Sequence, residues 1–271
     1  MKIFSYLISM PDDVDTLPDA LDSLAKFCDR IFVVDGLMGE KTLSQHPRFL
    51  EPLRDWIITR DEFGVDYNTT PNGLALWNGV PLTLYENEFK TPGGQRNYIL
   101  GRMAQEPEQP NWVVWIDSDE ICSNEFISDI RPYLEGLPPD ISNVCPKWLT
   151  LIQDEQHYAP AHSGWLSHAR IHHPGIARWV EQWHEHMNYV GQREAWDRKI
   201  IHTRMLFRRR LFVQRGHAVV NEGAWSNVTA VPVPAGITWN MHWPESEPIG
   251  MPFDSDIRIY QNGKWATVEN D

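Results

Sequence analysis

The stretch that most constrains this chain is an apolar run that leads directly into acidic residues. Trp112 to Ile116 are five consecutive apolar residues, and Asp117, Ser118, Asp119 and Glu120 follow them. A short run of β-branched and aromatic residues is typical of a strand that is buried on both faces, as in a parallel sheet. Ionised carboxylates are costly away from water unless they are paired or bound to a metal ion. The stretch therefore predicts a buried strand that ends either in a solvated turn or in a charged site.

Two of these carboxylates have the spacing of a cation site. Asp117 and Asp119 are two residues apart, so on a continuing strand their side chains would point to the same side. Two oxygen donors on one side suit Mg²⁺ or Mn²⁺, which bind a few protein carboxylates together with substrate phosphates.

The first part of the chain alternates between strand and helix patterns. Lys2 to Ser9 and Arg30 to Gly36 are predicted strands, and Asp15 to Pro18 opens the helix between them. This rhythm predicts an α/β fold with an open, mostly parallel sheet. Ligands of such sheets bind at the carboxyl ends of the strands, where both Asp35 and Asp117 fall.

The later segments are less uniform. Glu62 to Lys90 is rich in Asn, Gly and Pro and is expected to form a long irregular excursion. Helices are expected to begin after Thr91 and at Ser123 or Asn124, and Asn143 to Ile152 is a predicted strand. Much of the second half is expected to be irregular.

Composition narrows the classes of protein. The 271 residues include no run of 18 apolar residues, so no transmembrane helix is expected, and the N-terminus lacks the apolar region of a signal peptide. The three Cys residues have unrelated spacings, which predict neither a disulfide framework nor a zinc site. We therefore expect a soluble protein of the cytoplasm of a bacterium or of a virus-infected host cell. Its 13 Trp residues are expected to include some that line a sugar or base site, beside those of the core.

Charge is distributed unevenly. Residues 1–140 carry a net charge of −13, whereas residues 141–271 are neutral overall. The neutral half contains a basic cluster made of Arg193, Arg198, Lys199, Arg204, Arg208, Arg209, Arg210 and Arg215. An acidic protein is not a general binder of nucleic acid, but a local basic patch can hold phosphates.

The order of these motifs resembles that of family-2-like glycosyltransferases of the GT-A fold. A helix with Gln95-Arg96-Asn97, followed by a strand that reads Trp-Val-x-x-x-Asp-x-Asp-Glu, is similar to the core of that family. Arg204-Met-Leu-Phe-Arg-Arg and Val220-Asn221-Glu222 resemble its later "Arg-Leu-Phe-Arg … His-Glu" region, although the family usually has His where this chain has Asn221. The resemblance covers about residues 1–245.

The resemblance implies an activity and a division of the chain. Such enzymes transfer a hexosyl or pentosyl group from a nucleotide-diphosphate sugar, here expected to be a UDP-sugar, to an acceptor hydroxyl. A Mn²⁺ or Mg²⁺ ion bridges the donor diphosphate. Residues 1–140 would bind the donor and residues 141–271 the acceptor, within one continuous GT-A domain.

The resemblance also implies roles for particular residues. Asp119 would bind the metal ion, and Asp117 would contact the ribose or the metal and its water. His242 matches the late His that often completes the metal site. Asp35 would hydrogen-bond the nucleoside, and Arg96 would pair with the nucleotide or support the acidic turn.

Other candidate residues follow from the chemistry of the transfer. An inverting transfer, which we expect, needs a carboxylate that deprotonates the acceptor hydroxyl, whereas a retaining transfer, the alternative, needs no such base. Glu222, after a predicted strand, is the first candidate for this base, and Asp154 is the second. Arg204 and Arg208 would grip the donor diphosphate or an anionic acceptor; the alternative is a solvated basic face.

Several alternatives stay open. A nucleotidyltransferase also uses an Asp-x-Asp pair, although it usually has a Gly-rich phosphate loop after its first strand, which Ser9 to Asp13 does not provide. A catalytically silent carbohydrate-binding protein would keep the same fold. The acceptor of a glycosyltransferase could be a sugar, a lipid-linked glycan, a protein or a hydroxymethylated base of DNA. The His-rich segment from His157 to His186 could bind zinc, but it lacks the His-Glu-x-x-His spacing.

The assignment of the general base can be tested directly. Glu222→Gln is expected to lower turnover strongly and to leave donor affinity unchanged, because the amide cannot accept the acceptor's proton. Steady-state kinetics combined with donor titration measure the two quantities separately. Equal losses in turnover and donor affinity would assign Glu222 a structural role instead.

Overall fold

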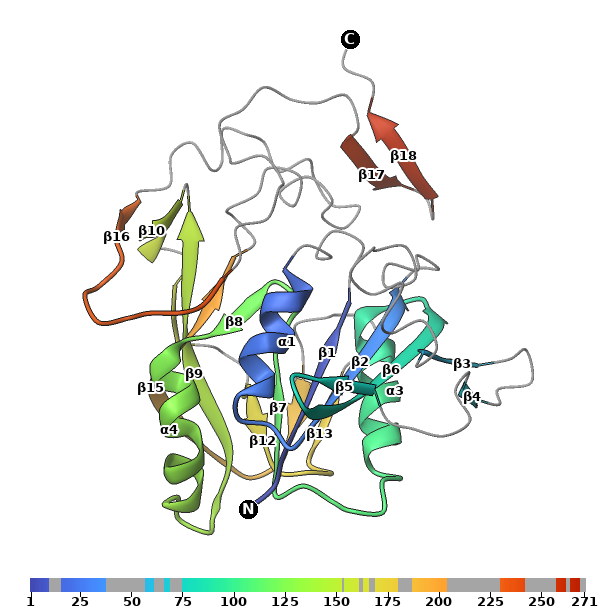
Figure 1. Cartoon of the computed structure of the whole chain (residues 1–271), viewed down its shortest axis with the longest axis horizontal. Coiled ribbons are helices and arrows are strands. Elements are labelled where there is room, and N and C mark those ends of the chain that lie inside the picture. The colour runs from blue at the N-terminus through green and yellow to red at the C-terminus, as the bar shows by residue number, and fades with distance from the viewer. Residues whose placement is uncertain are drawn as a thin grey trace.

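The structure is a computed structural model (Figure 1). It describes residues 1–9, 16–37, 57–60, 66–68, 75–152, 154–160, 163–165, 169–179, 187–203, 230–241, 257–261 and 264–268. The helices are α1 (Leu17–Ala25), α3 (Pro92–Met103) and α4 (Asn124–Glu135). The strands are β1 (Ile3–Ile8), β2 (Arg30–Leu37), β3 (Ile57–Arg60), β4 (Asp66–Asn68), β5 (Ala75–Trp77), β6 (Val80–Phe89), β7 (Trp112–Trp115), β8 (Glu120–Cys122), β9 (Ile141–Ile152), β10 (Asp154–Tyr158), β11 (Gly164–Trp165), β12 (Ile171–His172), β13 (Ala177–Trp179), β14 (Met187–Tyr189), β15 (Gln192–His202), β16 (Val231–Pro232), β17 (Ile257–Gln261) and β18 (Lys264–Val268).

A large mixed sheet forms the centre of the fold. Its main path runs in the order β16-β10-β9-β12-β7-β1-β2-β6-β3-β4. The strands from β7 to β3 on this path are all parallel to their neighbours, and β12 adds to β7 in the antiparallel sense. The predicted α/β fold with a mostly parallel central sheet is therefore confirmed.

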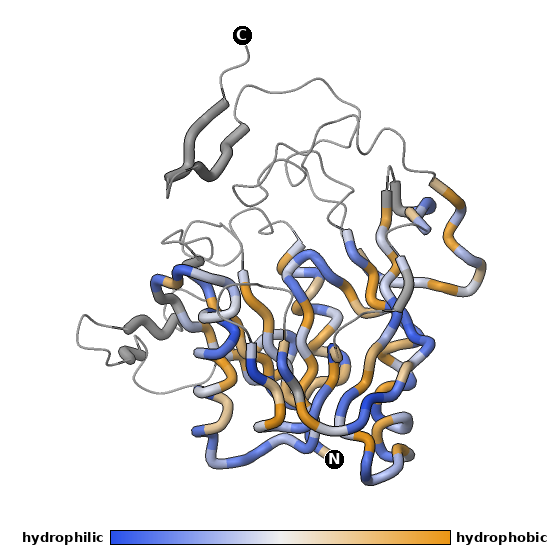
Figure 2. Tube along the Cα trace, turned by 180° about the vertical axis from the view of Figure 1, so that it is seen from behind, coloured by the Kyte–Doolittle hydropathy of each residue, from blue (hydrophilic) through white to orange (hydrophobic). Residues whose placement is uncertain are grey.

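Helices cover both faces of the parallel strands (Figure 1). Side chains of α1 and α4 pack in one core cluster with Ile3, Ile31 and Val114. Side chains of α3 pack in a second cluster with the alternate strand residues, which include Tyr6 and Trp115. Both faces of β1, β2 and β7 are thus buried. Figure 2 shows that hydrophobic residues are concentrated in the central strands. This is why these strands read as continuous apolar runs.

The segment before α3 differs from its prediction. Glu62 to Lys90 was expected to be irregular, but it contains β6, which is the parallel neighbour of β2. Leu82 and Leu84 alternate with Thr83 and Tyr85 along this strand, and all four side chains are buried. The prediction of an irregular segment was wrong here. It relied on Pro81 and on the Asn and Gly residues of the preceding turn, and it overlooked the short alternating pattern that follows them.

Strands from the second half of the chain extend the same sheet. β9 runs beside β12 and is also paired in parallel with β15. β15 in turn pairs with β8, which begins at Glu120, the last of the acidic residues. Residues on either side of position 140 therefore share one sheet, while the division into donor and acceptor halves stays a prediction.

Two expectations from composition bear on the described residues. Cys28, Cys122 and Cys145 are all buried free thiols, which fits the prediction that they form no disulfide framework. Within the described ranges, no helix has the length and apolar character needed to cross a membrane.

The start of α3 provides a test of local stability. The helix begins after Thr91 as predicted, and the Thr91 hydroxyl caps it by accepting a hydrogen bond from the Gly94 N–H at 3.1 Å. Thr91→Ala is expected to lower the free energy of unfolding by about 1 kcal/mol, because a helix N–H loses its acceptor. Urea unfolding measures this change. Thr91→Ser, which keeps the hydroxyl, is the control, and an equal loss in that variant would contradict the capping role.

Candidate functional site

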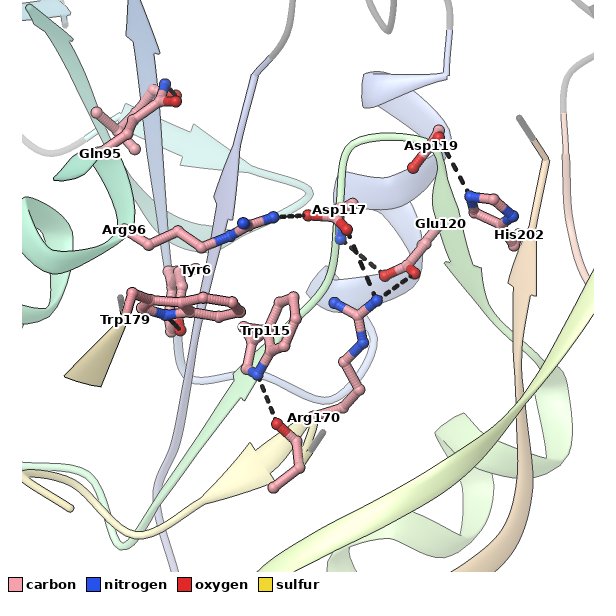
Figure 3. Close-up of polar contacts among 12 residues, drawn as sticks. Tyr6, Gln95, Arg96, Trp115, Asp117, Asp119, Glu120, Arg170, Trp179 and His202 are labelled. Carbon is pink, nitrogen blue, oxygen red and sulfur yellow. Dashed lines mark hydrogen bonds and ion pairs between the residues drawn. The ribbon is translucent and has the colours of Figure 1, made fainter. Parts of the chain in front are cut away.

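The acidic residues lie in a turn at the carboxyl end of β7. The strand ends at Trp115, and the Glu120 N–H donates to the Asp117 carbonyl at 3.0 Å, which closes the turn. The Thr16 hydroxyl, at the start of α1, donates to the Ser118 carbonyl at 2.8 Å. The expectation that strand alternation would align Asp117 and Asp119 was therefore wrong, because the chain has left the strand. The turn itself sets the directions of both side chains (Figure 3).

Asp117 lies between two buried arginines. Its Oδ1 is paired with Arg96 Nη2, and its Oδ2 is 3.6 Å from Arg170 Nη2. Both arginine side chains are 1 % exposed. Arg96 comes from α3 and Arg170 from the residue before β12, so they reach the carboxylate from different elements (Figure 3). Arg96 therefore contacts the acidic turn, and its predicted pairing with the nucleotide stays a prediction.

Glu120 closes a ring of interactions around the same turn. Its side chain is fully buried, and its Oε2 accepts a hydrogen bond from the Asp117 N–H at 2.8 Å. Its Oε1 is 2.6 Å from Arg170 Nη2. Burial raises the pKa of Glu120 to about 7, and Arg170 opposes this shift. Glu120 therefore holds the turn through two contacts, one with the Asp117 backbone N–H and one with Arg170.

Tryptophan rings line the buried side of the two arginines. The Arg170 guanidinium lies 3.6 Å from the centre of a Trp115 ring, and the Arg96 guanidinium lies 4.4 Å from a Trp179 ring. The Trp115 indole N–H donates to the Ala169 carbonyl at 2.7 Å. Cation–π contacts of this kind stabilise a guanidinium that has lost its water. These two Trp residues therefore hold the arginines in place.

Asp119 faces a histidine. Its Oδ2 is 3.4 Å from His202 Nε2, and its carbonyl accepts hydrogen bonds from the Thr203 N–H and hydroxyl at 2.9 and 2.8 Å. His202 ends β15 and lies opposite Glu120 in the pairing of β15 with β8. Its ring stacks on Trp148, with 4.9 Å between the ring centres. The sheet thus fixes the imidazole beside the second carboxylate of the Asp-x-Asp pair.

These side chains fit a divalent cation in part. Asp119 and His202 supply a carboxylate oxygen and an imidazole nitrogen, which are donors that Mn²⁺ accepts. Among the described residues, no group of three or more His, Cys, Asp or Glu side chains is arranged to hold a metal ion. Asp119 and His202 are therefore the pair that would hold the cation here, and further oxygens would have to come from elsewhere.

A further acidic residue, Asp35, lies at the edge of the sheet that carries the acidic turn. Asp35 is on β2 and is fully buried; β2 is separated from β7 only by β1. The Gln95 side-chain amide donates to the Val34 carbonyl at 2.9 Å, and the next residue of α3, Arg96, reaches Asp117. The start of α3 therefore links the ends of β2 and β7 across β1.

Of the remaining predicted site residues, only Asp154 lies within the described part of the chain, and its strand is distant from β7 in the sheet. Asp154 begins β10, which is separated from β7 by β9 and β12 in the strand order. Arg204, Arg208, Glu222 and His242 lie outside the described residues. Their roles stay predictions.

Sequence reasoning missed Arg170 and His202. His202 follows Ile200 and Ile201, but most of β15 is polar, so this strand end lacks the long apolar run that precedes Asp35 and Asp117. Arg170 carried no such signal either. Its position depends on the pairing of β12 with β7, in which the Trp115 N–H donates to the Arg170 carbonyl at 2.9 Å.

Comparison with known proteins gives little beyond this geometry. No family model and no curated protein matches the chain. One solved structure that matches is TarS of S. aureus, residues 1–349, with a TM-score of 0.43 and 15 % sequence identity. The match covers 75 % of this chain and 60 % of that one, so this chain spans less than two thirds of the TarS structure. The function proposed below therefore rests on the residues of the site.

A buried histidine lies on β12, two residues after Arg170. His172 of β12 has its Nδ1 2.8 Å from the His173 carbonyl, and its ring contacts the edge of Tyr6. Burial lowers the pKa of His172 to about 4. Because the imidazole is neutral in the folded protein, it takes up a proton more readily after unfolding.

This histidine predicts a pH dependence of stability. Between pH 6.5 and about 4 the unfolded chain is protonated at His172 and the folded protein is not, so its contribution to stability is lost as the pH falls. His172→Phe removes this contribution. The stability difference between wild type and variant is expected to change by up to about 3 kcal/mol over this range, in the direction that favours the variant at low pH. Urea unfolding at several pH values measures it, and a constant difference would contradict the buried neutral state.

Proposed function

We propose that this chain is a glycosyltransferase that moves a sugar from a nucleotide-diphosphate sugar to an acceptor hydroxyl with the aid of a divalent cation. The observation that carries the proposal is the acidic turn of Asp117 and Asp119, held by buried arginines at the carboxyl edge of a parallel sheet beside Asp35. That edge is where open α/β sheets bind their ligands. The motif resemblance of residues 90–125 supports the same activity.

Different residues at this edge of the sheet would bind different parts of the donor. Asp35 would accept hydrogen bonds from the nucleoside, and Asp117 stays a predicted contact to the ribose or to cation-bound water. Asp119 and His202 would hold the cation, together with the predicted ligand His242. When bound, the cation would offset the negative charge that develops on the departing nucleotide diphosphate.

The acceptor reaction depends on residues outside the described part of the chain. Glu222 is proposed as the base that removes the proton of the acceptor hydroxyl in an inverting transfer. The acceptor is proposed to be a glycan or a hydroxymethylated base of DNA. An anionic acceptor would meet the basic cluster that begins on β15, in which Arg198 and Lys199 are already paired with Asp129 and Asp197.

A thermal-shift screen tests the donor side of the proposal. Nucleotides and nucleotide sugars are compared with and without Mn²⁺. A ligand at about 100 times its dissociation constant is expected to stabilise the fold by about 2.7 kcal/mol. The expected result is a cation-dependent shift with a nucleotide diphosphate and its sugar conjugate. If none of the nucleotides shifts the melting temperature, a carbohydrate-binding protein is favoured. If the protein transfers a nucleotidyl group from a triphosphate, a nucleotidyltransferase is favoured.

The same screen applies to the proposed cation ligand. Asp119→Asn is expected to abolish sugar transfer and the Mn²⁺-dependent shift without unfolding the protein, because the amide is a much weaker ligand. Asp197→Asn is the matched control, since Asp197 is an exposed aspartate on the strand that carries His202 and pairs with Lys147 and Lys199. Undiminished turnover in Asp119→Asn would overturn the assignment.

A further inference from the structure

The position of Arg170 gives it a role that its place in the sequence does not reveal. The guanidinium is 1 % exposed, and one nitrogen, Nη2, contacts both Glu120 Oε1 at 2.6 Å and Asp117 Oδ2 at 3.6 Å. Glu120 in turn accepts the Asp117 N–H at 2.8 Å. Arg170, Glu120 and Asp117 therefore form a closed ring that holds the side chain and the backbone of Asp117 at once.

The ring is anchored on rigid elements. The Arg170 carbonyl accepts the Trp115 N–H at 2.9 Å, and the Arg170 N–H donates to the Val144 carbonyl at 3.1 Å. The guanidinium lies 3.6 Å from the centre of a Trp115 ring and 5.2 Å from a Trp148 ring. Arg170 is thus fixed by backbone pairing on two sides and by aromatic rings, as a side chain that orients others must be.

The other donors of Arg170 are not used within the described residues. Its Nε and Nη1 are buried and have no hydrogen-bond partner there. An apolar side chain would fill the same space at a lower cost in free energy, because a buried charge is costly unless it is well paired. Arg170 forms its ion pairs with the two acids that flank Ser118 and Asp119, which indicates that it holds this turn.

We propose that Arg170 is a positioning residue that, through Glu120 and Asp117, sets the geometry in which Asp119 meets the cation and the donor diphosphate. The inference rests on the proposed function, but its first step, the holding of the turn, does not require any ligand. Arg96 pairs with Asp117 from α3 on the other oxygen, so it also holds this carboxylate. Arg170 contacts both Asp117 and Glu120 through a single guanidinium nitrogen.

The test uses variants that avoid an isolated buried charge. Arg170→Met by itself leaves Glu120 buried without its cation and can fail to fold, whereas Arg170→Met combined with Glu120→Gln removes both charges together. Arg170→Lys keeps a positive charge but loses the planar contact with Trp115. Arg131→Met is the matched control, because Arg131 pairs with Asp29 at 2.9 Å and belongs to no part of the turn.

The first measurement needs no ligand. Amide hydrogen exchange of residues 116–122 reports the Asp117 and Glu120 N–H groups that close the turn. In the double variant, exchange at these two amides is expected to be faster by about tenfold or more, while the other strands keep their protection. Arg131→Met should leave these amides unchanged. Unchanged protection in a folded double variant would overturn the positioning role.

The second measurement concerns the donor. In the double variant, Mn²⁺-dependent nucleotide affinity is expected to fall by about 10- to 100-fold, the usual effect of removing a residue that orients a metal ligand. Arg170→Lys should recover part of this loss, and Arg131→Met should show none. Wild-type affinity in the double variant would overturn the inference.

The two measurements separate the two proposals. If the wild-type protein binds no nucleotide with or without Mn²⁺, the proposed function fails, while the hydrogen-exchange result still decides whether Arg170 holds the turn. If nucleotide binds and the exchange is unchanged in the double variant, the proposed function stands and the role of Arg170 is overturned.

Discussion

The pairing of two buried arginines with the acidic turn is the interaction on which the site depends. Three carboxylates follow a strand whose side chains are all buried, and such a concentration of negative charge is unfavourable away from water. Arg96 and Arg170 offset the charge of Asp117 and Glu120 within the protein. The remaining acid, Asp119, is also buried and lies beside His202. Without the arginines, the chain would have to protonate these acids or open the turn to solvent.

The sheet topology delivers the two arginines to opposite sides of one carboxylate. α3 connects β6 to β7, and its first turn passes the carboxyl ends of β2 and β1, which places Arg96 over the turn. Arg170 arrives from the other direction because β12 pairs with β7 in the antiparallel sense. Trp115, the last residue of β7, packs against both guanidinium groups. The strand that ends in the acids therefore also carries the ring that supports their counter-ions.

How far the sequence predicts this protein depends on the range of the interactions. β1, β2, β7 and the helices that begin near Leu17, Pro92 and Asn124 follow from local apolar runs, capping residues and prolines, and they were predicted. β6 was missed because Pro81 interrupts its apolar residues and an Asn-Gly turn directly precedes it. Arg170 and His202 were missed because their neighbours in space, Glu120 and Asp119, are 50 and 83 positions away in the chain. Only strand pairing brings them together, and no local pattern encodes it.

The surroundings of the two aspartates make them different, although the sequence presents them as an equivalent pair. Asp117 has an arginine beside each carboxylate oxygen, so an incoming cation would meet a carboxylate whose charge is already compensated. Asp119 has an imidazole beside one oxygen, and that imidazole is itself a metal donor. We therefore expect a cation near the turn to be bound by Asp119 rather than by Asp117. In the proposed arrangement the first aspartate would belong to the scaffold and the second would be the ligand, because the sheet places arginines beside one and an imidazole beside the other.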